Sequence, residues 1–504
     1  MRFFDRARLD RAFDAGSIAV IGAKKANGYF WLRMFTTFQG AVYSVHVNPE
    51  SVSDIEAMGI PNYRSILDVP RPIDYVVVNT PRRIAVETFA ECIEAGVGAV
   101  SFFTAGFAET DEEGSKIQAT LTAMSRASGV PILGPNCTGI YNPSRGMSSM
   151  TGMPLGESGP VGMVSQSGTH AGFFAKALFS WYGIRETRGI SLGNAAVLDA
   201  ADWIEYIGDD DRVEVLAAYI EGIGDRDAGD HERFATTLRH VTAKKPVVIW
   251  KGGNTADGAR VAGNHTGAMP VTPEDWAWIL GSTGAVGVDT MEALVDTAAT
   301  LVKLPELRGP RVGLIILTGG QGIAITDAFA RRGLRVPPLA QASLDELAGF
   351  FDPIGGSFRN PLDAAYATET PAMLARELDI LARDPNVDVV VMDLFSTIMS
   401  VPRIQSDFGV GLGHLEHMAA GAGDRFIDVM AAQSTRGAKP FFITVTAAEN
   451  EREALELREV LKSAGVLGFP SAERAAVAYA NALAYWGARR ATSGEVQANP
   501  GGTM

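Results

Sequence analysis

Short apolar runs alternate with longer amphipathic stretches along the first part of the chain, from residue 17 to about residue 134. Four runs have the length and β-branched content of strands: Ser17–Gly22, Ala41–Val47, Ile73–Val78 and Ala99–Phe103. The stretches Ile84–Ala95 and Asp111–Ser128 have the periodicity of amphipathic helices. Continuous apolar strands separated by helices predict a parallel sheet that is covered on both faces.

The same alternation occurs twice more. A second set of strands includes Val161–Val164, Val215–Ile220 and Pro246–Trp250, and a third set begins at Arg311. The pattern therefore predicts an α/β protein with three parallel-sheet domains, which we place at residues 1–145, 155–305 and 310–490. The small, polar stretch 491–504 contains Gly and Pro, and we expect it to be a disordered tail.

Composition restricts the class of protein and its partners. The 504 residues carry a formal net charge of −14 with both signs well mixed, which argues against nucleic acid or an anionic membrane as a partner. Two cysteines, Cys92 and Cys137, cannot build a disulfide framework. The N-terminus has no uninterrupted apolar core, and no apolar run approaches the roughly 20 residues of a membrane helix. These features predict a soluble cytoplasmic protein.

Two glycine-containing loops lie where a predicted strand leads into a helix. One includes Ser167 and Gly168, and the other includes Gly320, Gln321 and Gly322. Backbone N–H groups at such a helix N-terminus can hold a phosphate. Many α/β turns are glycine-rich for close packing alone, so both interpretations stay open for each loop.

His265 is the candidate phosphoryl carrier. It lies in a segment of small residues that leaves the imidazole accessible, and a neutral imidazole nitrogen is nucleophilic at physiological pH. Glu221 ends a predicted strand and can orient one ring nitrogen. The alternatives are a loop histidine bonded to backbone and an ordinary solvated carboxylate. His414 and His417 have a metal-like spacing without an evident third ligand, so we expect no metal site.

Several short motifs, taken together in their order, resemble a known family. They are Val47-Asn-Pro49, Thr104-Ala-Gly-Phe-Ala-Glu109, Gly134-Pro-Asn-Cys137, Ser165-Gln-Ser-Gly-Thr169, Ser191-Leu-Gly-Asn194, Tyr219-Ile-Glu221, Asn264-His-Thr-Gly-Ala268 and Asn360-Pro-Leu-Asp363. The chain resembles the α subunit of NDP-forming, in particular ADP-forming, acetyl-CoA synthetases, within the succinyl-CoA synthetase superfamily. The resemblance covers nearly the whole chain.

This resemblance implies an N-terminal Rossmann-like CoA-binding domain followed by two flavodoxin-like domains. It implies that His265 is phosphorylated, that Glu221 orients it, and that the two glycine loops stabilise the phosphohistidine. The reaction would join a carboxylic acid to CoA through an acyl phosphate, while a nucleoside triphosphate becomes a diphosphate. The residues that we expect to bind CoA are Gly22, Lys24, Lys25, Asn48, Pro81, Thr104, Ala105 and Gly106.

Two features depart from the family pattern. Nothing resembles an ATP-grasp domain, so ATP or ADP with Mg²⁺ would be bound by a separate β subunit, in an assembly expected to be α2β2. Relatives have a lysine after Asn-Pro, whereas this chain has Glu50, and Lys24 and Lys25 can supply the missing charge.

Two other functions remain as alternatives. One is a non-catalytic regulatory protein that binds CoA or acyl-CoA. The other is a Rossmann oxidoreductase, although the first loop lacks the Gly-x-Gly-x-x-Gly pattern.

Overall fold

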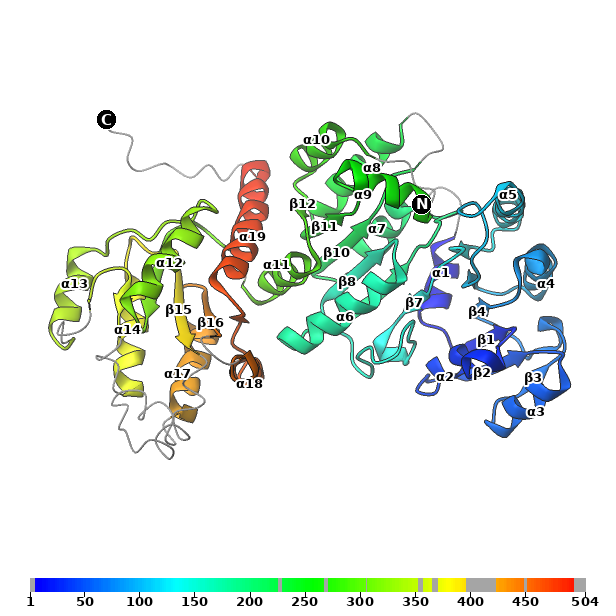
Figure 1. The fold of residues 1–504 in the computed structure, drawn as a ribbon, viewed down its shortest axis with the longest axis horizontal. Coiled ribbons are helices and arrows are strands. Elements are labelled where there is room, and N and C mark those ends of the chain that lie inside the picture. The colour runs from blue at the N-terminus through cyan, green and yellow to red at the C-terminus, as the bar shows by residue number, and fades with distance from the viewer. Residues whose placement is uncertain are drawn as a thin grey trace. The chain divides into compact units, whose positions relative to one another are not determined.

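The computed structural model describes residues 5–224, 229–266, 271–304, 306–351, 357–364, 370–395, 423–447 and 451–493. It divides into two compact units. The first comprises Met1–Phe179 and Ile184–Leu294, and the second comprises Ser180–Gly183 and Val295–Met504. Each unit is built around mostly parallel sheets flanked by helices (Figure 1).

The first sheet, in the first unit, has six strands in the order β3-β2-β1-β4-β5-β6, all parallel. Its strands are β1 (Ser17–Ile21), β2 (Ala41–Val45), β3 (Asn62–Tyr63), β4 (Tyr75–Val78), β5 (Ala99–Phe102) and β6 (Ile132–Leu133). Its helices are α1 (Arg6–Phe13), α2 (Phe30–Met34), α3 (Pro49–Ala57), α4 (Ala85–Ala95) and α5 (Glu112–Ser128), with 3₁₀ turns η1 (Lys25–Asn27), η2 (Ile66–Asp68) and η3 (Arg82–Ile84). The strand order reverses between β1 and β4, and ligands of such sheets bind at the carboxyl ends of the strands near that point.

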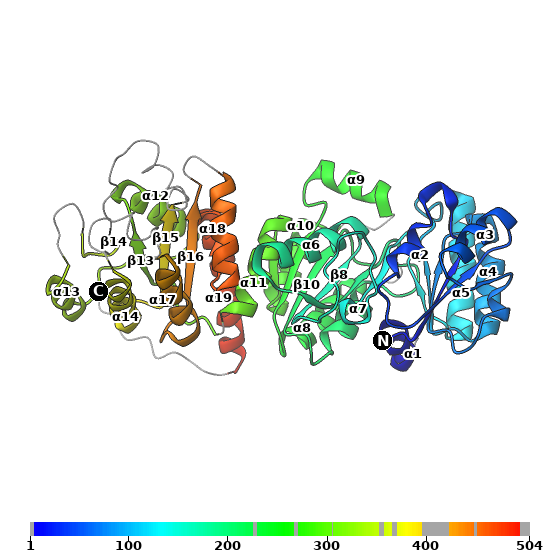
Figure 2. The same ribbon diagram turned by 90° about the horizontal axis from the view of Figure 1, so that it is seen from below.

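The second sheet, also in the first unit, has the order β12-β11-β10-β8-β9-β7, with β7 antiparallel to β9. Its strands are β7 (Gly139–Tyr141), β8 (Val161–Ser165), β9 (Glu186–Ser191), β10 (Val215–Ile220), β11 (Val247–Lys251) and β12 (Val286–Val288). The associated helices are η4 (Pro143–Arg145), α6 (Gly168–Tyr182), α7 (Ala200–Gly208), α8 (Asp230–Thr242), α9 (Ala256–Thr266), α10 (Pro273–Thr283) and α11 (Met291–Lys303). Figure 2 shows α9 on the outside of this part of the unit.

The second unit contains a five-stranded sheet in the order β14-β13-β15-β16-β17. Its strands are β13 (Val312–Ile316), β14 (Leu362–Asp363), β15 (Val389–Phe395), β16 (Phe441–Thr446) and β17 (Gly468–Phe469). Its helices are α12 (Gly319–Ala330), α13 (Gln341–Ala348), α14 (Pro371–Arg383), α17 (Gly423–Arg436), α18 (Glu451–Ser463) and α19 (Ala472–Ser493). All of its strand pairs are parallel.

Aromatic packing joins the two sheets of the first unit. Phe13 at the end of α1 contacts Trp203 and Tyr206 of α7, with ring centroids 6.0 and 5.3 Å apart. All three side chains are fully or almost fully buried, and rings of this size contribute strongly to a core. The carboxyl ends of both sheets are therefore held in one compact body.

The predicted α/β fold is confirmed, because all three sheets are parallel or mostly parallel and every strand named from the sequence is present within a few residues. The strand β7 pairs with the second sheet, although it lies within the range 1–145 that we predicted for the first domain. The expected disordered tail was wrong at its start, because α19 continues through Ser493. The rest of that tail lies outside the described residues. Among the described helices, none is long and apolar enough to cross a membrane.

Candidate functional site

The residues predicted to bind CoA gather at the carboxyl edge of the first sheet. Gly22 follows β1, Asn48 follows β2, Pro81 follows β4 and Thr104 follows β5. Because these strands are parallel neighbours, their ends share one edge. Gly22 has φ +80°, a conformation that favours glycine, and a Cβ there would lie 2.7 Å from a methyl carbon of Thr80. This part of the predicted set is thus brought together by the fold.

The amide oxygen of Asn48 already has a local role. It accepts hydrogen bonds from the backbone N–H groups of Glu50 and Ser51, at 3.0 and 3.2 Å, and so caps α3. Its amide nitrogen is the group that remains for a ligand. The Thr104 hydroxyl donates to the Thr80 carbonyl at 2.6 Å, which fixes the loop after β5 against the loop after β4.

Two polar side chains that the sequence reasoning missed lie in the same place. The amide nitrogen of Asn79 and the hydroxyl of Thr80 are buried without a hydrogen-bond partner among the described residues. Buried polar groups are nearly always bonded, so an unpaired pair at a sheet edge fits a ligand that supplies the missing partners. A phosphate- and amide-rich molecule such as CoA suits these donors. No local pattern in the sequence marks them, because the fold decides which polar side chains are buried without a partner.

The two lysines of the first loop differ in their surroundings. Lys25 pairs with Glu50 at 2.7 Å and with Asp54 at 3.1 Å, between its Nζ and the carboxylate oxygens. The hydrogen bonds that the Lys25 ammonium donates to Glu50 first, and then to Asp54, raise the pKa of Lys25 above its usual range. Lys24 is exposed and has no ion pair among the described residues. Two carboxylates therefore neutralise the charge of Lys25. The charge of Lys24 is the one that remains available for a ligand.

The loop with Ala105 and Gly106 is connected to the second sheet. Gly106 has φ +100°, and its N–H donates to Glu109 Oε1 at 2.6 Å. The other oxygen of Glu109 accepts from the side-chain amide of Asn194 at 2.6 Å. Asn194 lies in the motif after β9, so Glu109 links the predicted CoA loop to the sheet that leads to Glu221 and His265.

At the N-terminus of α6, Gly168 packs closely against Thr138, and hydrogen-bond donors without acceptors lie beside it. The Ser167 hydroxyl accepts from the N–H of His170 at 3.3 Å and caps the helix. A Cβ at Gly168 would lie 2.6 Å from a side-chain carbon of Thr138, so only glycine fits there without displacing Thr138. The Thr138 hydroxyl is buried and has no hydrogen-bond partner among the described residues. The first N–H groups of a helix lack intrahelical acceptors, and here they lie beside another free donor.

A cavity of about 190 Å³ opens at this helix end. Its lining comes from both sheets of the first unit: Phe103, Asn136, Cys137, Thr138, Gln166, Ser167, Gly168, Thr169 and Gly193. Cys137 is buried in the lining, and burial raises the pKa of its thiol to about 11. The thiol is therefore protonated at neutral pH.

Glu221 is buried directly after β10, with 6% of its surface exposed. Its backbone N–H and that of Gly222 both donate to the side-chain oxygen of Gln166, the second at 3.1 Å. The Tyr219 hydroxyl donates to Glu221 Oε1 at 3.2 Å. Glu221 is therefore held at the sheet edge from two neighbouring strands, and the expectation of a solvated carboxylate is wrong.

An aromatic cluster supports this carboxylate. The rings of His170, Tyr219 and Trp250 lie 4.3 to 4.8 Å apart by their centroids. Burial first, and then the Glu221 carboxylate, raise the pKa of Tyr219, so that its hydroxyl stays a donor. The cluster thus fixes the tyrosine that in turn holds Glu221.

His265 lies in the last turn of α9, on a helix and not on the loop that one interpretation expected. Its side chain is outside what the structure describes, so its contact with Glu221 remains a prediction. The helix starts five residues after β11, the direct neighbour of β10 in the sheet. His265 and Glu221 therefore belong to segments that leave adjacent strands at the same edge.

The second glycine loop begins α12 in the second unit. Gly320 is exposed at the helix start, and the side-chain nitrogen of Gln321 donates to the Thr446 hydroxyl at 3.0 Å. Gly322 is buried, and a Cβ there would lie against the Cδ1 carbon of Ile316, so the glycine allows close packing against β13. For Gly320, Gln321 and Gly322, anion binding stays a prediction.

No group of three or more histidine, cysteine, aspartate or glutamate residues with metal-binding geometry is found in the described ranges. His414 and His417 lie outside those ranges.

Two protein-family models match the chain. The CoA binding domain matches residues 16–143, and the succinyl-CoA ligase like flavodoxin domain matches residues 158–301. The matched ranges contain the first and second sheets and the candidate site between them.

Curated relatives are similar along most of the chain. Subunit alpha of acetate–CoA ligase [ADP-forming] II from Pyrococcus furiosus is 32% identical, and the match covers 94% of this chain and 97% of that protein. Acetate–CoA ligase [ADP-forming] I from Archaeoglobus fulgidus is 30% identical over 79% of this chain, which corresponds to 56% of that longer protein.

Solved structures agree with these relatives. PH0766 from Pyrococcus horikoshii OT3 has a TM-score of 0.75 at 26% identity and covers 95% of this chain and 99% of its own. The Ca. Korarchaeum cryptofilum dinucleotide forming acetyl-coenzyme A synthetase 1, in complex with phosphate and ADP, has a TM-score of 0.79 at 24% identity, with 97% of this chain and 99% of its own covered. The second likeness supports the fold alone.

Proposed function

Since the chain belongs to the family of ADP-forming acetate–CoA ligase α subunits, we propose that it performs the CoA- and phosphoryl-transfer steps of an acid–CoA ligase through His265. The overall reaction joins a carboxylic acid to CoA while a nucleoside triphosphate becomes a diphosphate and phosphate. CoA, when bound at the first sheet, supplies the thiol that becomes acylated. The residues of this chain bind the reactants and carry the phosphoryl group.

The phosphoryl step on the chain is a displacement at phosphorus. A neutral ring nitrogen of His265 attacks an acyl phosphate, the phosphorus–oxygen bond to the acyl group breaks, and the carboxylate leaves. A nucleoside diphosphate then removes the phosphoryl group. Glu221 accepts a hydrogen bond from the N–H of the other ring nitrogen, which orients the imidazole and stabilises its developing charge. Synthesis of acyl-CoA runs through the same steps in reverse.

The proposal depends on one observation above all. The cavity at the α6 N-terminus takes its lining from both sheets of the first unit, so a ligand at the carboxyl edge of the first sheet ends beside Ser167 and Gly168. Backbone N–H groups and a helix dipole stabilise a phosphoryl group at such a place. Glu221 is tied to the same cavity through Gln166. In the second unit, Gly320 and Gln321 are proposed to bind phosphate through the N-terminus of α12.

A separate partner follows from the subunit names of the relatives. We propose that an ATP-grasp β subunit binds ATP or ADP with Mg²⁺ and exchanges the phosphoryl group with His265, in an α2β2 assembly. The two family models that match this chain describe a CoA binding domain and a succinyl-CoA ligase like flavodoxin domain. The sheets of these two kinds lie within the described residues 5–224, 229–266 and 271–304.

The test is intact-protein mass spectrometry after incubation of the chain with acetyl phosphate at alkaline pH. We expect an added mass of about 80 Da, one phosphoryl group, on the wild type and on His240→Ala but not on His265→Ala. His240 is a matched control because it is exposed and bonds to Asp209 on the surface. Glu221→Gln should slow labelling by roughly a hundredfold or more. Equal labelling of the His265→Ala variant would overturn the assignment.

A second candidate function is favoured by the Lys25–Glu50 pair. Glu50 stands where the family pattern has a lysine, and it pairs with the predicted phosphate-binding Lys25. This departure motivates the alternative of a non-catalytic regulatory protein that binds CoA or acyl-CoA. This function predicts CoA binding without any phosphoryl adduct, both with acetyl phosphate and with the ATP-loaded partner.

A further inference from the structure

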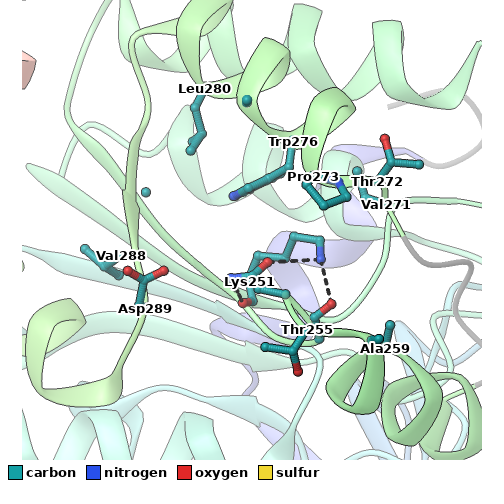
Figure 3. A pocket seen from close by; sticks show the side chains of 15 residues that line it. Lys251, Thr255, Ala259, Val271, Thr272, Pro273, Trp276, Leu280, Val288 and Asp289 are labelled. Carbon is teal, nitrogen blue, oxygen red and sulfur yellow. Dashed lines mark hydrogen bonds between the residues drawn. The ribbon is translucent and has the colours of Figure 1, made fainter.

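A larger cavity lies apart from the one at α6, at the carboxyl ends of β11 and β12 in the first unit. Its volume is about 640 Å³, within the range of small-molecule sites. The start of α9 closes one side and α10 closes the other (Figure 3). Most of the lining is apolar and includes Val271, Pro273, Trp276, Leu280 and Val288. None of the residues with an assigned or proposed role in phosphoryl transfer lines it.

Lys251 places a positive charge in this apolar cavity. Only 3% of its surface is exposed, and its ammonium lies 3.2 to 3.3 Å from two backbone carbonyls and the amide oxygen of Asn254. No carboxylate of the described residues forms an ion pair with it, and burial alone lowers its pKa. Asp289 also lines the cavity, but it is exposed and makes no ion pair with Lys251. A buried charge that only neutral oxygens surround is destabilising, and an anionic ligand relieves it.

Trp276 supplies a flat surface opposite this charge. Its ring reaches from α10 into the cavity above Lys251, as Figure 3 shows. Trp278, two residues further along the helix, is 44% exposed and does not line the cavity. An indole and a buried ammonium on two sides of one pocket match a ligand with a flat apolar body and one negative charge.

We propose that this cavity is a binding site for a small organic monoanion, whose carboxylate pairs with Lys251 and whose flat apolar body packs on Trp276. The inference is independent of phosphohistidine chemistry, because it depends on the cavity and its charge alone.

The position of the site connects it to α9. Ala256 and Ala259 in the first turns of α9, with Thr255 directly before it, line the cavity, and His265 lies in the last turn of the same helix. His265 is nine positions after Ala256, which corresponds to roughly 13 Å along a helix. A ligand at Lys251 therefore contacts the helix of the carrier histidine without reaching its end. A small carboxylate bound at Lys251 is either an effector of the enzyme or the acid substrate, bound there before it reacts.

The experiment titrates the full chain with benzoate and follows tryptophan fluorescence, with benzamide as the uncharged ligand of the same shape. We expect saturable quenching by benzoate and at least thirtyfold weaker binding of benzamide. Lys251→Met keeps the apolar stem and removes the charge, so it should fold and bind benzoate roughly thirtyfold more weakly. Trp276→Phe should abolish most of the quenching, whereas the matched control Trp278→Phe should retain it.

Two further measurements complete the test. Isothermal titration calorimetry measures benzoate binding without tryptophan fluorescence. A variant that folds but has a different tryptophan emission is therefore still compared correctly with the wild type. Equal affinity for benzamide and benzoate, or unchanged benzoate binding by Lys251→Met, would overturn the proposal. If benzoate binds and discharges phosphorylated chain in the presence of CoA, and Lys251→Met loses both properties, the site holds substrate. If Lys251→Met loses benzoate binding but its phosphorylated chain is still discharged, the site holds an effector.

Discussion

Gln166 offers a direct test of the site because its side-chain oxygen accepts two backbone hydrogen bonds at once. The donors are the N–H groups of Glu221 and Gly222, and Gln166 itself also lines the cavity at the α6 N-terminus. Two substitutions separate its roles. Gln166→Met removes the acceptor and adds no charge, whereas Gln166→Glu keeps an acceptor and adds a negative charge.

The expected magnitudes follow from burial and charge. Each buried N–H that loses its acceptor costs about 1–3 kcal/mol, and water from the adjacent cavity can replace part of this. Gln166→Met should therefore destabilise the first unit by about 2–4 kcal/mol, a fall of roughly 4–10 °C in its melting temperature. In Gln166→Glu the two N–H donors remain satisfied, so the melting temperature should change little. A negative charge about 5 Å from a bound phosphate costs about 3 kcal/mol per unit charge, which weakens phosphate binding roughly a hundredfold.

Differential scanning calorimetry measures the first effect, and phosphorus NMR titration with inorganic phosphate at pH 8 measures the second. Gln39→Met is the control, because Gln39 is an exposed glutamine outside the site. The reasoning fails if Gln166→Met melts with the wild type, since the two N–H groups would then not depend on this acceptor. It also fails if Gln166→Glu binds phosphate normally, since the cavity would then not be the anion site.

Three further results are expected. Burial raises the pKa of Asp393 from 3.8 to about 6, although threonine hydroxyls donate to its carboxylate. The second unit should therefore lose about 2 kcal/mol of stability as pH rises from 4 to 6, and Asp393→Asn should flatten this slope in urea unfolding at several pH values. Glu50→Gln frees Lys25 from one of its two carboxylates, so CoA should bind roughly two- to fivefold more tightly in calorimetric titration, and no change would indicate that Lys25 does not face CoA. The raised pKa of Cys137, about 11, predicts negligible alkylation of the native chain by iodoacetamide at pH 8 and rapid alkylation after unfolding.

Most of the fold could be predicted because its strands are continuous apolar runs. The residues of β1, β8, β10 and β13 are all buried, and sequence periodicity alone identifies such strands. Two-residue strands such as β3 and β17 carry too little pattern to be recognised. The antiparallel strand β7 could not be predicted for a different reason. Gly139–Tyr141 pairs with β9, about fifty residues later, and no local sequence pattern indicates that pairing.

The site was predictable only where a local motif carried it. The turn at Ser167 and Gly168 could be recognised, because a strand, a small loop and a helix follow one another in the sequence. The unpaired donors of Asn79 and Thr80, and the hold of Gln166 on Glu221, could not be recognised. They depend on which side chains the fold buries without a partner, and on contacts between residues 55 positions apart. Lys251 was missed because an isolated lysine at a strand end is usually solvated.

The order of the second sheet explains why these groups meet. Gln166 follows β8, Glu221 follows β10 and Lys251 ends β11, and these three strands are consecutive neighbours in the sheet. Parallel strands are spaced by about 4.8 Å, so the three side chains lie within two strand spacings at one edge although 85 residues separate the first from the last. The helix that carries His265 leaves from the third of these strands, while Glu221 leaves from the second. A ligand that shifts the start of α9 against β11 therefore changes the position of the histidine relative to a glutamate that Gln166 and Tyr219 hold in place.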